Sequence, residues 1–444
     1  MPQRIYEPAA YGEASLGGCY WYDSVPDDTR WPSADGTIDV DFAIVGAGYT
    51  GLSAALTLAQ AGVEVAVLDA HRPGWGASGR NGGFCCIGGA KATGRQIRRR
   101  WGEEDLACFR RAERAAIEMV RARISGLGVN ADIHSESGEL QIAHSQPAFR
   151  AMRREAAALA ETYGTTAEVL SRAEMIEQGL KLRGAWGGLH LGLGFALNPR
   201  KYVLGLAREV VACGARLYAD SPVLSTGRTE DGRHLLRLPH GTVRARRLLI
   251  ATNGYSSDDL PPWMAARYLP MQSSVIVTRP LEDEEIAKQG WSSDLMAYDS
   301  RNLLHYFRLM PDRRMLFGMR GAVRWTDAAQ DAQRRAVLRH FRHMFPAWRR
   351  VDVPWFWSGL VCMARDLVPF AGQIGPDTWA AFAWHGNGVA MGSWTGEQLA
   401  KLALGQATEM PGFFGRTPPK FTLGARRRAG LPAALLWYRL RDAF

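Results

Sequence analysis

The sequence predicts a mixed α/β fold whose nucleotide-binding part is assembled from separated segments. The chain has 444 residues, which is more than one compact core usually holds, so two domains are expected. Residues 39–69 follow the order strand, glycine-rich turn, helix and strand, which is typical of a Rossmann-type unit. Apolar strands and helices of the same kind return near 198–254 and 379–405, and these segments can complete the first sheet.

The composition is that of a globular protein, with 47% hydrophobic and 22% charged residues, so nothing indicates disorder. No window approaches the roughly 18–20 uncharged apolar residues of a membrane-spanning helix. The N-terminus has no basic segment followed by an apolar run. We therefore predict a cytoplasmic protein without an integral membrane segment.

The chain is basic, with a net charge of +10 and arginine clusters at 95–101 and 425–430. Such charge can attract nucleic acid, an anionic membrane or acidic partners. No nucleic-acid module with interleaved aromatic residues accompanies it. We therefore interpret the basic residues as lying on solvent-exposed helix faces, and no nucleic-acid partner is predicted.

The six cysteines show no CxxC pair and no zinc spacing with histidine, so no metal site and no disulfide framework are expected. Cys85 and Cys86 are adjacent, and adjacent cysteines rarely reach disulfide geometry without strain. The pattern therefore predicts that the cysteines are free thiols in a reducing cell interior.

The strongest motif is the loop GAGYTG at 46–51. Gly46 permits the tight turn, Gly48 lets a pyrophosphate approach the backbone, and Gly51 lets helix and strand pack closely. The second strand ends in Asp69, whose carboxylate can accept hydrogen bonds from a ribose hydroxyl. Because every part falls at the required spacing, the motif predicts an adenine-dinucleotide site.

The segments that follow distinguish this chain from a simple NAD enzyme. Residues 70–84 form a glycine-rich loop that is too irregular for another crossover helix. Further on, Asn198 and Pro199 begin a helix as cap and first residue, and a strand is expected to end near Val223. A hairpin then leads into an apolar strand at 248–251. A nucleotide domain in separated pieces accounts for this order.

Six stretches in order carry a family resemblance, namely CYWYDSVP, DFAIVGAGYTGLSAAL, GASGRNGGF, RLLIATNGY, NLLHYFRL and HGNGVAMGSWTGEQLA. Together they resemble the D-amino-acid-oxidase-like FAD-dependent oxidoreductases, above all the gamma-glutamylputrescine oxidase branch, with glycine oxidase and sarcosine oxidase as wider relatives. The resemblance runs from about residue 19 to the end of the chain. It implies one FAD and the oxidation of a C–N bond in a small amine or amino acid. A hydride would pass to flavin N5, the imine would hydrolyse, and O2 would reoxidise the flavin.

The resemblance also implies a Rossmann-type FAD-binding domain interrupted by an antiparallel-sheet substrate domain. The expected boundaries are 36–92, 195–260 and 353–408 for the FAD-binding domain, 93–194 and 261–352 for the substrate domain, 1–35 for an N-terminal extension, and 409–444 for a tail with an amphipathic helix.

The cofactor contacts implied by the resemblance begin at the GAGYTG loop and continue through the glycine-rich loop after Asp69. Val223 would present its backbone to adenine, and Asn253 with Gly254 would meet the cofactor after the third strand. The full set is Gly46, Gly48, Tyr49, Thr50, Gly51, Asp69, Ala70, Gly76, Ala77, Ser78, Gly79, Arg80, Asn81, Gly82, Gly83, Val223, Asn253, Gly254, Cys362, Gly386, Gly388, Val389 and Ala390.

The second glycine-rich turn, at 386–392, does not open a second dinucleotide unit. A ribose-reading residue should follow about 20 residues later at the end of a strand, and the sequence after Gly405 has prolines and no apolar strand. The preceding segment WAAFAW can instead add to the existing sheet. The helix start would then stabilise the negative charge of reduced flavin. Without an NADPH site, electrons must come from the substrate.

The resemblance implies that the substrate needs orientation and desolvation more than acid or base catalysis. Period-two alternation sends His305 and Phe307 to one face of their strand and Tyr306 and Arg308 to the other, and the sequence leaves open which face meets the flavin. The tryptophans could also form an aromatic cage for an ammonium group. The candidate catalytic residues are His305, Tyr306, Trp357, Trp384, His385 and Asn387, with Arg308, Arg320 and Trp355 nearby.

Three positions depart from the family pattern. Sarcosine oxidases carry a substrate-binding lysine where this chain has Ala390, many relatives have histidine where Asn387 stands, and the putrescine-derivative oxidase has an acidic residue at the position of His305. These differences disfavour both a sarcosine-like binding mode and gamma-glutamylputrescine as substrate.

The segment GLVCMARD resembles the one in which sarcosine oxidases link a cysteine to the flavin, so Cys362 could hold FAD covalently. The alternative is a buried cysteine that packs as a small hydrophobic residue. Both interpretations stay open at this point.

Three functions remain. The first is an FAD-dependent amine or amino-acid oxidase. The second keeps the fold but passes electrons to a quinone or carrier protein. The third is a flavin-binding, RNA-associated protein whose basic residues would bind the RNA backbone.

Overall fold

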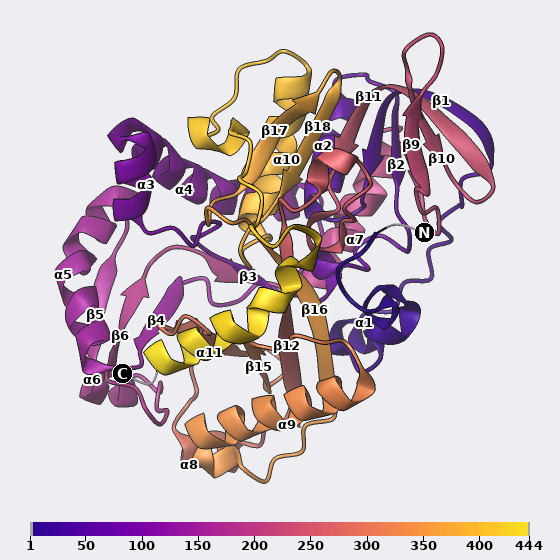
Figure 1. The fold of residues 1–444 in the computed structure, drawn as a ribbon. Helices are drawn as coiled ribbons and strands as arrows, with labels where there is room; N and C mark the ends of the chain where they lie inside the picture. Colours follow the sequence, from indigo (N-terminus) through magenta and orange to yellow (C-terminus); the bar gives the residue numbers. More distant parts are fainter. Residues whose placement is uncertain (1–2, 443–444) are drawn as a thin grey trace.

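The computed structural model describes residues 3–442, which fold around two β-sheets of eight strands each. Residues 1–2 of the expected N-terminal extension and 443–444 of the expected tail lie outside the described residues. The first sheet occupies the upper part of Figure 1 and the second the lower part. The predicted mixed α/β fold is confirmed.

The first sheet has a parallel core assembled from three separated segments of the chain. Its edge strand β17 (Phe370–Gly375) runs antiparallel to β18, and the hairpin of β9 (Ser225–Arg228) and β10 (His234–Arg237) continues from β11. The discontinuous arrangement predicted from the sequence is therefore present. The parallel core runs in the order β18 (Thr378–Phe382), β11 (Gly241–Ile250), β1 (Gly36–Val45), β2 (Val65–Leu68) and β8 (Arg216–Tyr218).

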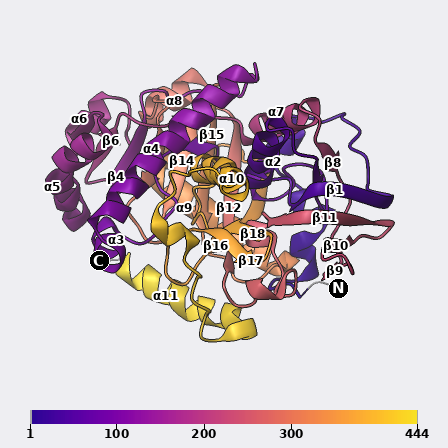
Figure 2. The same ribbon diagram turned by 90° about the horizontal axis from the view of Figure 1, so that it is seen from above.

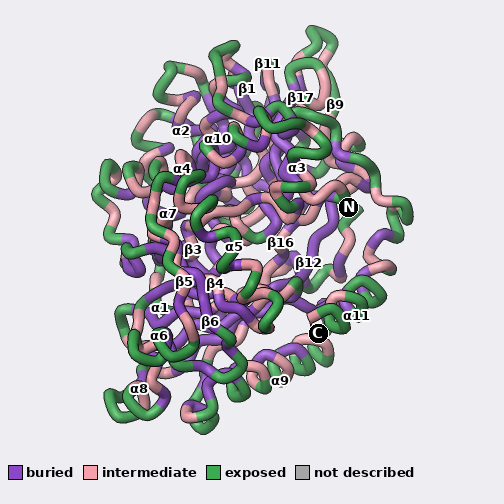
Figure 3. Tube along the Cα trace, turned by 90° about the vertical axis from the view of Figure 1, so that its left-hand side faces the viewer, coloured by how far each residue is buried: buried purple, intermediate pink, exposed green. Residues whose placement is uncertain are grey.

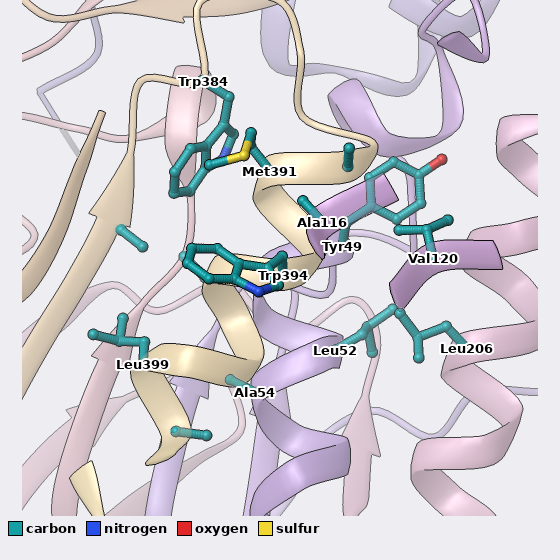
Figure 4. Close-up of a cluster of buried hydrophobic side chains, with 14 of the residues drawn as sticks. Tyr49, Leu52, Ala54, Ala116, Val120, Leu206, Trp384, Met391, Trp394 and Leu399 are labelled. Atoms are coloured by element: carbon teal, nitrogen blue, oxygen red, sulfur yellow. The ribbon is translucent and has the colours of Figure 1, made fainter. Parts of the chain in front are cut away.

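Four helices build the hydrophobic core beside this sheet. α10 (Ala390–Ala403) contacts both α2 (Tyr49–Gln60) and α4 (Glu103–Gly126), and α2 contacts α7 (Pro199–Ala212). Seen from above, α10 lies near the centre of the molecule (Figure 2). The side chains that meet there are apolar, and Figure 4 shows Leu52, Val120, Leu206 and Trp394 among them.

The start of α7 agrees with its sequence signals. The Asn198 side chain accepts hydrogen bonds from the amides of Arg200 and Lys201, each at 3.2 Å, and Pro199 occupies the first turn. This cap satisfies amide groups that have no partner within the helix.

The second sheet is antiparallel except where β13 and β4 run parallel. α9 (Asp327–Met344) packs on β12 and β15, and α5 (Gln146–Tyr163) packs on β4, β5 and β6. α8 (Asp283–Gln289) and α6 (Arg172–Glu177) lie at its periphery, and the outward faces of these helices are exposed (Figure 3). The order is β16 (Trp355–Met363), β12 (Leu269–Pro280), β15 (Arg314–Arg320), β14 (His305–Leu309), β13 (Met296–Asp299), β4 (Glu139–Ala143), β6 (Gly187–Leu191) and β5 (Ala167–Ser171).

Two strands differ from the sequence expectations. Residues 353–408 were expected in the nucleotide-binding part, but β16 pairs with β12 of the second sheet from Trp355 opposite Val277 to Met363 opposite Leu269. A run of apolar strand residues does not reveal which sheet it joins. β8 ends at Tyr218 rather than near Val223, and Asp220, two residues later, has a φ of +47°, which an extended strand does not allow.

The remaining elements connect and cover these layers. α11 (Leu431–Arg441) crosses the front of Figure 1; it buries Leu431 and Leu435 and exposes Leu436, Trp437 and Leu440. The expected tail helix thus packs on the protein along one side. Between residues 3 and 442, no helix is long and apolar enough to cross a membrane. The short elements are α1 (Tyr20–Ser24), α3 (Gly94–Trp101), and β3 (Phe84–Cys85) paired with β7 (Phe195–Ala196).

Candidate active site

A cavity of about 380 Å³ lies where the two sheets meet. Residues that follow β1, β2, β11 and β18 line one side of it, and residues of β12, β13, β14, β15 and β16 line the other. The first group stands at the carboxyl ends of parallel strands, where open α/β sheets bind their ligands. The cavity is therefore the candidate active site.

The GAGYTG loop connects β1 to α2 at one end of the cavity. Gly46 has a φ of +111°, which favours glycine. A Cβ on Gly51 would lie 1.9 Å from the carbonyl oxygen of Gly46, so only glycine allows α2 to start so close to the strand. The Tyr49 amide, at the first residue of α2, donates to Ser78 Oγ at 3.0 Å. The loop thus places the start of a helix, with its partial positive charge, against the cavity.

Asp69 follows β2 and lines the same end. Its Oδ2 accepts a hydrogen bond from the Ala47 amide at 2.6 Å, and its Oδ1 accepts one from the His71 amide at 2.9 Å. Burial raises the pKa of this carboxyl, and both amides oppose the shift. Each oxygen keeps acceptor capacity beyond these bonds, so Asp69 can still receive a ribose hydroxyl.

The glycine-rich loop after Asp69 is held by its own side chains. Asn81 donates to the carbonyl oxygens of Ala77 and Ser78 and accepts from the Gly83 amide at 2.8 Å. The Trp21 indole donates to the Asn81 carbonyl oxygen. The structure therefore gives Asn81 a role in shaping the loop.

Arg80 anchors this loop in the protein interior and is 2% exposed. Its Nε donates to the Trp75 carbonyl oxygen at 2.7 Å, and Nη1 donates to the Ser15 carbonyl oxygen at 3.1 Å. The Trp357 indole donates to the Arg80 carbonyl oxygen at 2.8 Å. Trp357 is absent from the cavity lining among the described residues, so the structure shows it supporting the loop from behind.

The alternation on β14 decides which residues reach the cavity. Tyr306 lines it and its hydroxyl lies 3.0 Å from Ser273 Oγ. His305 points to the opposite face, where Nδ1 bonds Asp299 Oδ2 at 2.6 Å and Nε2 lies 3.0 Å from His340 Nδ1. The candidate His305 is therefore separated from the cavity by its own strand, because successive side chains point to opposite faces.

Arg308 shares the side of Tyr306 but is used for structure. Its Nε donates to the Gly82 carbonyl oxygen at 2.9 Å, and Nη2 donates to the Leu197 carbonyl oxygen at 2.8 Å. Nη1 bonds His134 Nε2. Burial lowers the pKa of Arg308 to about 9, so the guanidinium is still charged at neutral pH and fastens the glycine-rich loop to the second sheet.

The turn between β18 and α10 brings His385 to the cavity in a fixed tautomer. Nδ1 donates to the Gly89 carbonyl oxygen at 2.8 Å, and Nε2 accepts from the Ala364 amide at 3.2 Å. Desolvation lowers its pKa to about 3, with the charges of Arg320 and Lys91 adding to the shift. Both ring nitrogens are occupied, so His385 holds the turn and is not available for proton transfer.

Asn387 and Trp384 lie in the same turn. Asn387 Nδ2 donates to the Cys86 carbonyl oxygen at 2.7 Å, while its buried Oδ1 has no partner among residues 3–442. Trp384 lines the cavity and packs against the hydrophobic core of α10 (Figure 4). The arrangement leaves an acceptor of Asn387 for a bound molecule.

Of the cofactor-binding and catalytic candidates expected from the sequence, most line the cavity and seven do not. The lining includes Gly46, Gly48, Tyr49, Thr50, Asp69, Ala70, Gly76, Ala77, Ser78, Arg80, Asn81, Gly82, Val223, Asn253, Cys362, Gly386, Gly388 and Val389, with Tyr306, Trp384, His385 and Asn387. In the described chain, the candidates outside the lining are Gly51, Gly79, Gly83, Gly254, Ala390, His305 and Trp357, and the nearby residues Arg308 and Trp355 also lie outside it.

Several cavity residues escaped the sequence analysis. Ser273, Tyr298 and Lys91 all line the cavity. The Tyr298 hydroxyl donates to Glu139 Oε1 at 2.7 Å, and burial raises the pKa of Glu139 to about 8. Only the lysine had a local signal, since Lys91 follows a glycine pair just after the glycine-rich loop.

Comparisons with known proteins identify the family of this chain and relatives of its fold. Residues 41–402 match the family described as FAD dependent oxidoreductase. The chain is 32% identical to a probable oxidoreductase OrdL of Rhizobium meliloti over 96% of this chain and 98% of that protein. It is 28% identical to gamma-glutamylputrescine oxidoreductase of Escherichia coli over 91% of this chain and 93% of that protein. The fold is shared with glycine oxidase from Geobacillus kaustophilus, at a TM-score of 0.69 and 18% identity over 85% of this chain and 98% of that chain.

A Rossmann-type loop facing a strand-built cavity defines a dinucleotide-dependent oxidoreductase. The chain belongs to the D-amino-acid-oxidase family of FAD-dependent oxidoreductases, and the resemblance, the cofactor and the enzyme class predicted from the sequence are confirmed. The residues present fit FAD. Buried polar atoms on the cavity wall lack partners among residues 3–442, namely Trp75 Nε1, Arg80 Nη2 and Asn387 Oδ1, and a flavin dinucleotide offers donors and acceptors for them.

Proposed function

We propose that this enzyme oxidises the C–N bond of a small amine or amino acid to an imine, which then hydrolyses, and that O2 is the electron acceptor. When bound, FAD supplies the two-electron acceptor for the C–H bond beside the nitrogen. One observation carries the proposal: the dinucleotide-binding loop and Trp384 open into the same cavity as Tyr306 and Ser273 of the opposite wall. Substrate and cofactor can therefore meet in one cavity.

The source of electrons follows from the elements around α10. In the part of the chain that the structure describes, α10 is followed by short helical segments and α11 and by no further strand. A second strand–helix–strand unit for NADPH is thus not built after the turn at 384–389. This supports a substrate that itself reduces the cofactor.

The protein's own residues orient the substrate and exclude water. Tyr306 and Ser273 offer hydroxyl groups on one wall, and Trp384 offers an aromatic surface on the other. Gly388 and Val389 line the cavity directly before α10, so this helix start is placed to stabilise negative charge that develops there.

Anaerobic mixing of the FAD-loaded protein with amines and amino acids tests the proposed function. We expect at least one substrate class to bleach the flavin absorbance, and peroxide to form when air is readmitted. Bleaching without peroxide would support the dehydrogenase that passes electrons to a quinone or carrier. If no amine or amino acid bleaches the flavin, the proposal is wrong, and salt-sensitive RNA binding would then favour the RNA-associated alternative.

A second prediction concerns how FAD is held. Cys362 lines the cavity, but it is 1% exposed and burial raises the pKa of its thiol to about 12. A covalent link needs the thiolate, which is disfavoured here. We therefore expect acid precipitation of the native protein to leave all the yellow colour in the supernatant. Colour retained in the pellet of the native protein and lost in a Cys362→Ala variant would establish the linkage.

A further inference from the structure

The helix α11 has one face that holds it to the rest of the protein. Leu431 and Leu435 are buried on this face, and Leu435 packs with Met271 and Leu303. Asp442, directly after the helix, accepts the Leu303 amide at 2.9 Å. These contacts fix α11 along the outside of the molecule (Figure 1).

The opposite face of α11 is also apolar. Leu436, Trp437 and Leu440 are 59%, 61% and 53% exposed, and Ala433 is exposed as well. These four residues, the outer stripe, follow the i, i+3, i+4, i+7 spacing of a single helix face. At 3.6 residues per turn, they lie on the side of the helix opposite Leu435. A helix face that borders only water is normally polar, so the outer stripe indicates an apolar partner.

Positive charge borders the outer stripe. Arg439 and Arg441 are exposed, and their helical positions place one on each side of the stripe. From residue 411 to residue 441 the sequence contains several arginines and a lysine but no aspartate or glutamate. The surface around the stripe therefore combines apolar and basic side chains, and it is complementary to a partner that is both apolar and negatively charged.

A second copy of the chain fits this surface poorly. In a two-fold dimer the same patch faces itself, so the arginines of both copies would repel one another. The helix has 11 residues and is about 16 Å long, whereas a stable interface buries at least about 1,200 Å². An anionic lipid surface meets both requirements, because its acyl chains can surround the apolar side chains and its headgroups can bind the arginines.

We propose that α11 attaches the enzyme to the surface of an anionic membrane, with the outer stripe inserted among the lipids and Arg439 and Arg441 at the headgroups. Leucine and tryptophan on one helix face, bordered by arginine, are typical of helices that lie in the plane of a lipid surface. Each arginine near anionic headgroups strengthens the attachment. The inference goes beyond the proposed function and does not depend on it.

Sedimentation of the FAD-loaded, full-length protein with lipid vesicles tests the inference. One set of vesicles consists of phosphatidylcholine alone, and the other contains two parts of phosphatidylcholine to one part of phosphatidylglycerol. We expect the protein to bind the mixed vesicles at low salt, to bind them more weakly as the salt concentration rises, and to leave phosphatidylcholine vesicles nearly unbound. No binding to the mixed vesicles, or equal binding to both sets, would overturn the inference.

Variants assign the binding to α11. Trp437→Ser should weaken binding to the mixed vesicles roughly 10-fold, because a large apolar side chain is no longer removed from water, whereas Trp437→Phe should keep most of the binding. Arg439→Gln and Arg441→Gln should each weaken it roughly 5-fold. The matched control Trp186→Ser removes a tryptophan that is 51% exposed outside α11 and should bind as the native protein does. Native binding by Trp437→Ser would show that the basic charge of other surfaces is sufficient, and the inference would be wrong.

Three further outcomes separate this inference from related ideas. Flavin content and urea-induced unfolding should be the same in Trp437→Ser as in the native protein; if that variant is unstable, the two arginine variants carry the test, and native binding by both contradicts the inference. If light scattering shows a dimer that the double variant Leu436→Ser, Leu440→Ser dissociates, the outer stripe joins two copies and the inference is wrong. If the mixed vesicles bind as expected but no amine or amino acid bleaches the flavin, the inference stands and the proposed function fails.

Discussion

Replacing Gly51 with alanine is expected to abolish the retention of FAD during purification. The added Cβ would lie 1.9 Å from the carbonyl oxygen of Gly46 and 3.2 Å from Ile44 Cγ2, so α2 must move away from β1. Gly48 and Tyr49 move with the helix start that faces the cavity. Overpacking of this kind costs about 1–3 kcal/mol, which corresponds to roughly 5- to 150-fold weaker binding if the whole cost falls on the cofactor site. The ratio of flavin to protein absorbance and the dissociation constant of FAD measure the effect.

Gly126→Ala is the matched control for this prediction. Gly126 is the last residue of α4, and a Cβ there would have nothing within 4 Å. This variant should keep its FAD and its stability. A Gly51→Ala protein as yellow as the native one would show that close packing of α2 on β1 is not needed for the cofactor.

The dinucleotide loop could be predicted because its requirements are local. Gly46, Gly51 and Asp69 lie within one strand–helix–strand unit, and their spacing alone sets where the backbone is tight and where the acid ends the strand. The same holds for Asn198, whose cap depends on the amides of Arg200 and Lys201, two and three residues after it. In such segments the sequence contains almost all of the relevant geometry.

The opposite wall of the cavity depends on pairings between distant strands. Alternation on β14 separates His305 from Tyr306, but only the contacts of the finished sheet show that Tyr306 faces Ser273 and that His305 faces Asp299. A strand pattern gives two faces without saying which one a ligand meets. The sequence therefore offers His305 as a candidate, but in the folded protein its side chain lies on the face of β14 away from the cavity.

Lys91 illustrates a second limit. A lone lysine in a loop is usually solvated, and only the finished fold brings Lys91 to the cavity near Arg320, which is more than 200 residues away in the sequence and lies on a different element. β16 was misassigned for a similar reason, since its partner β12 begins at Leu269, far from it along the chain. Both features depend on contacts between segments that are far apart in the chain, and such contacts cannot be predicted from a single sequence.

Replacing Arg308 with methionine is expected to lower the free energy of unfolding by about 3 kcal/mol, the cost of leaving buried acceptors without donors. The carbonyl oxygens of Gly82 and Leu197 and Nε2 of His134 all lose their partner. In the variant, burial still lowers the pKa of His134, so its ring stays neutral. Nδ1 donates to the Asp132 carbonyl oxygen, and Nε2 is left as an acceptor without a donor. Urea-induced unfolding measures the loss.

The same variant should also weaken FAD binding, because Arg308 fastens Gly82 of the glycine-rich loop and Gly82 lines the cavity. Arg237→Met is the control, since Arg237 is exposed on β10 and its replacement should change the free energy of unfolding by less than roughly 0.5 kcal/mol. If Arg308→Met unfolds like this control, the three buried bonds do not fix the loop. If it is destabilised but binds FAD normally, Arg308 supports the second sheet alone, and the position of the glycine-rich loop must depend on Arg80 and Asn81.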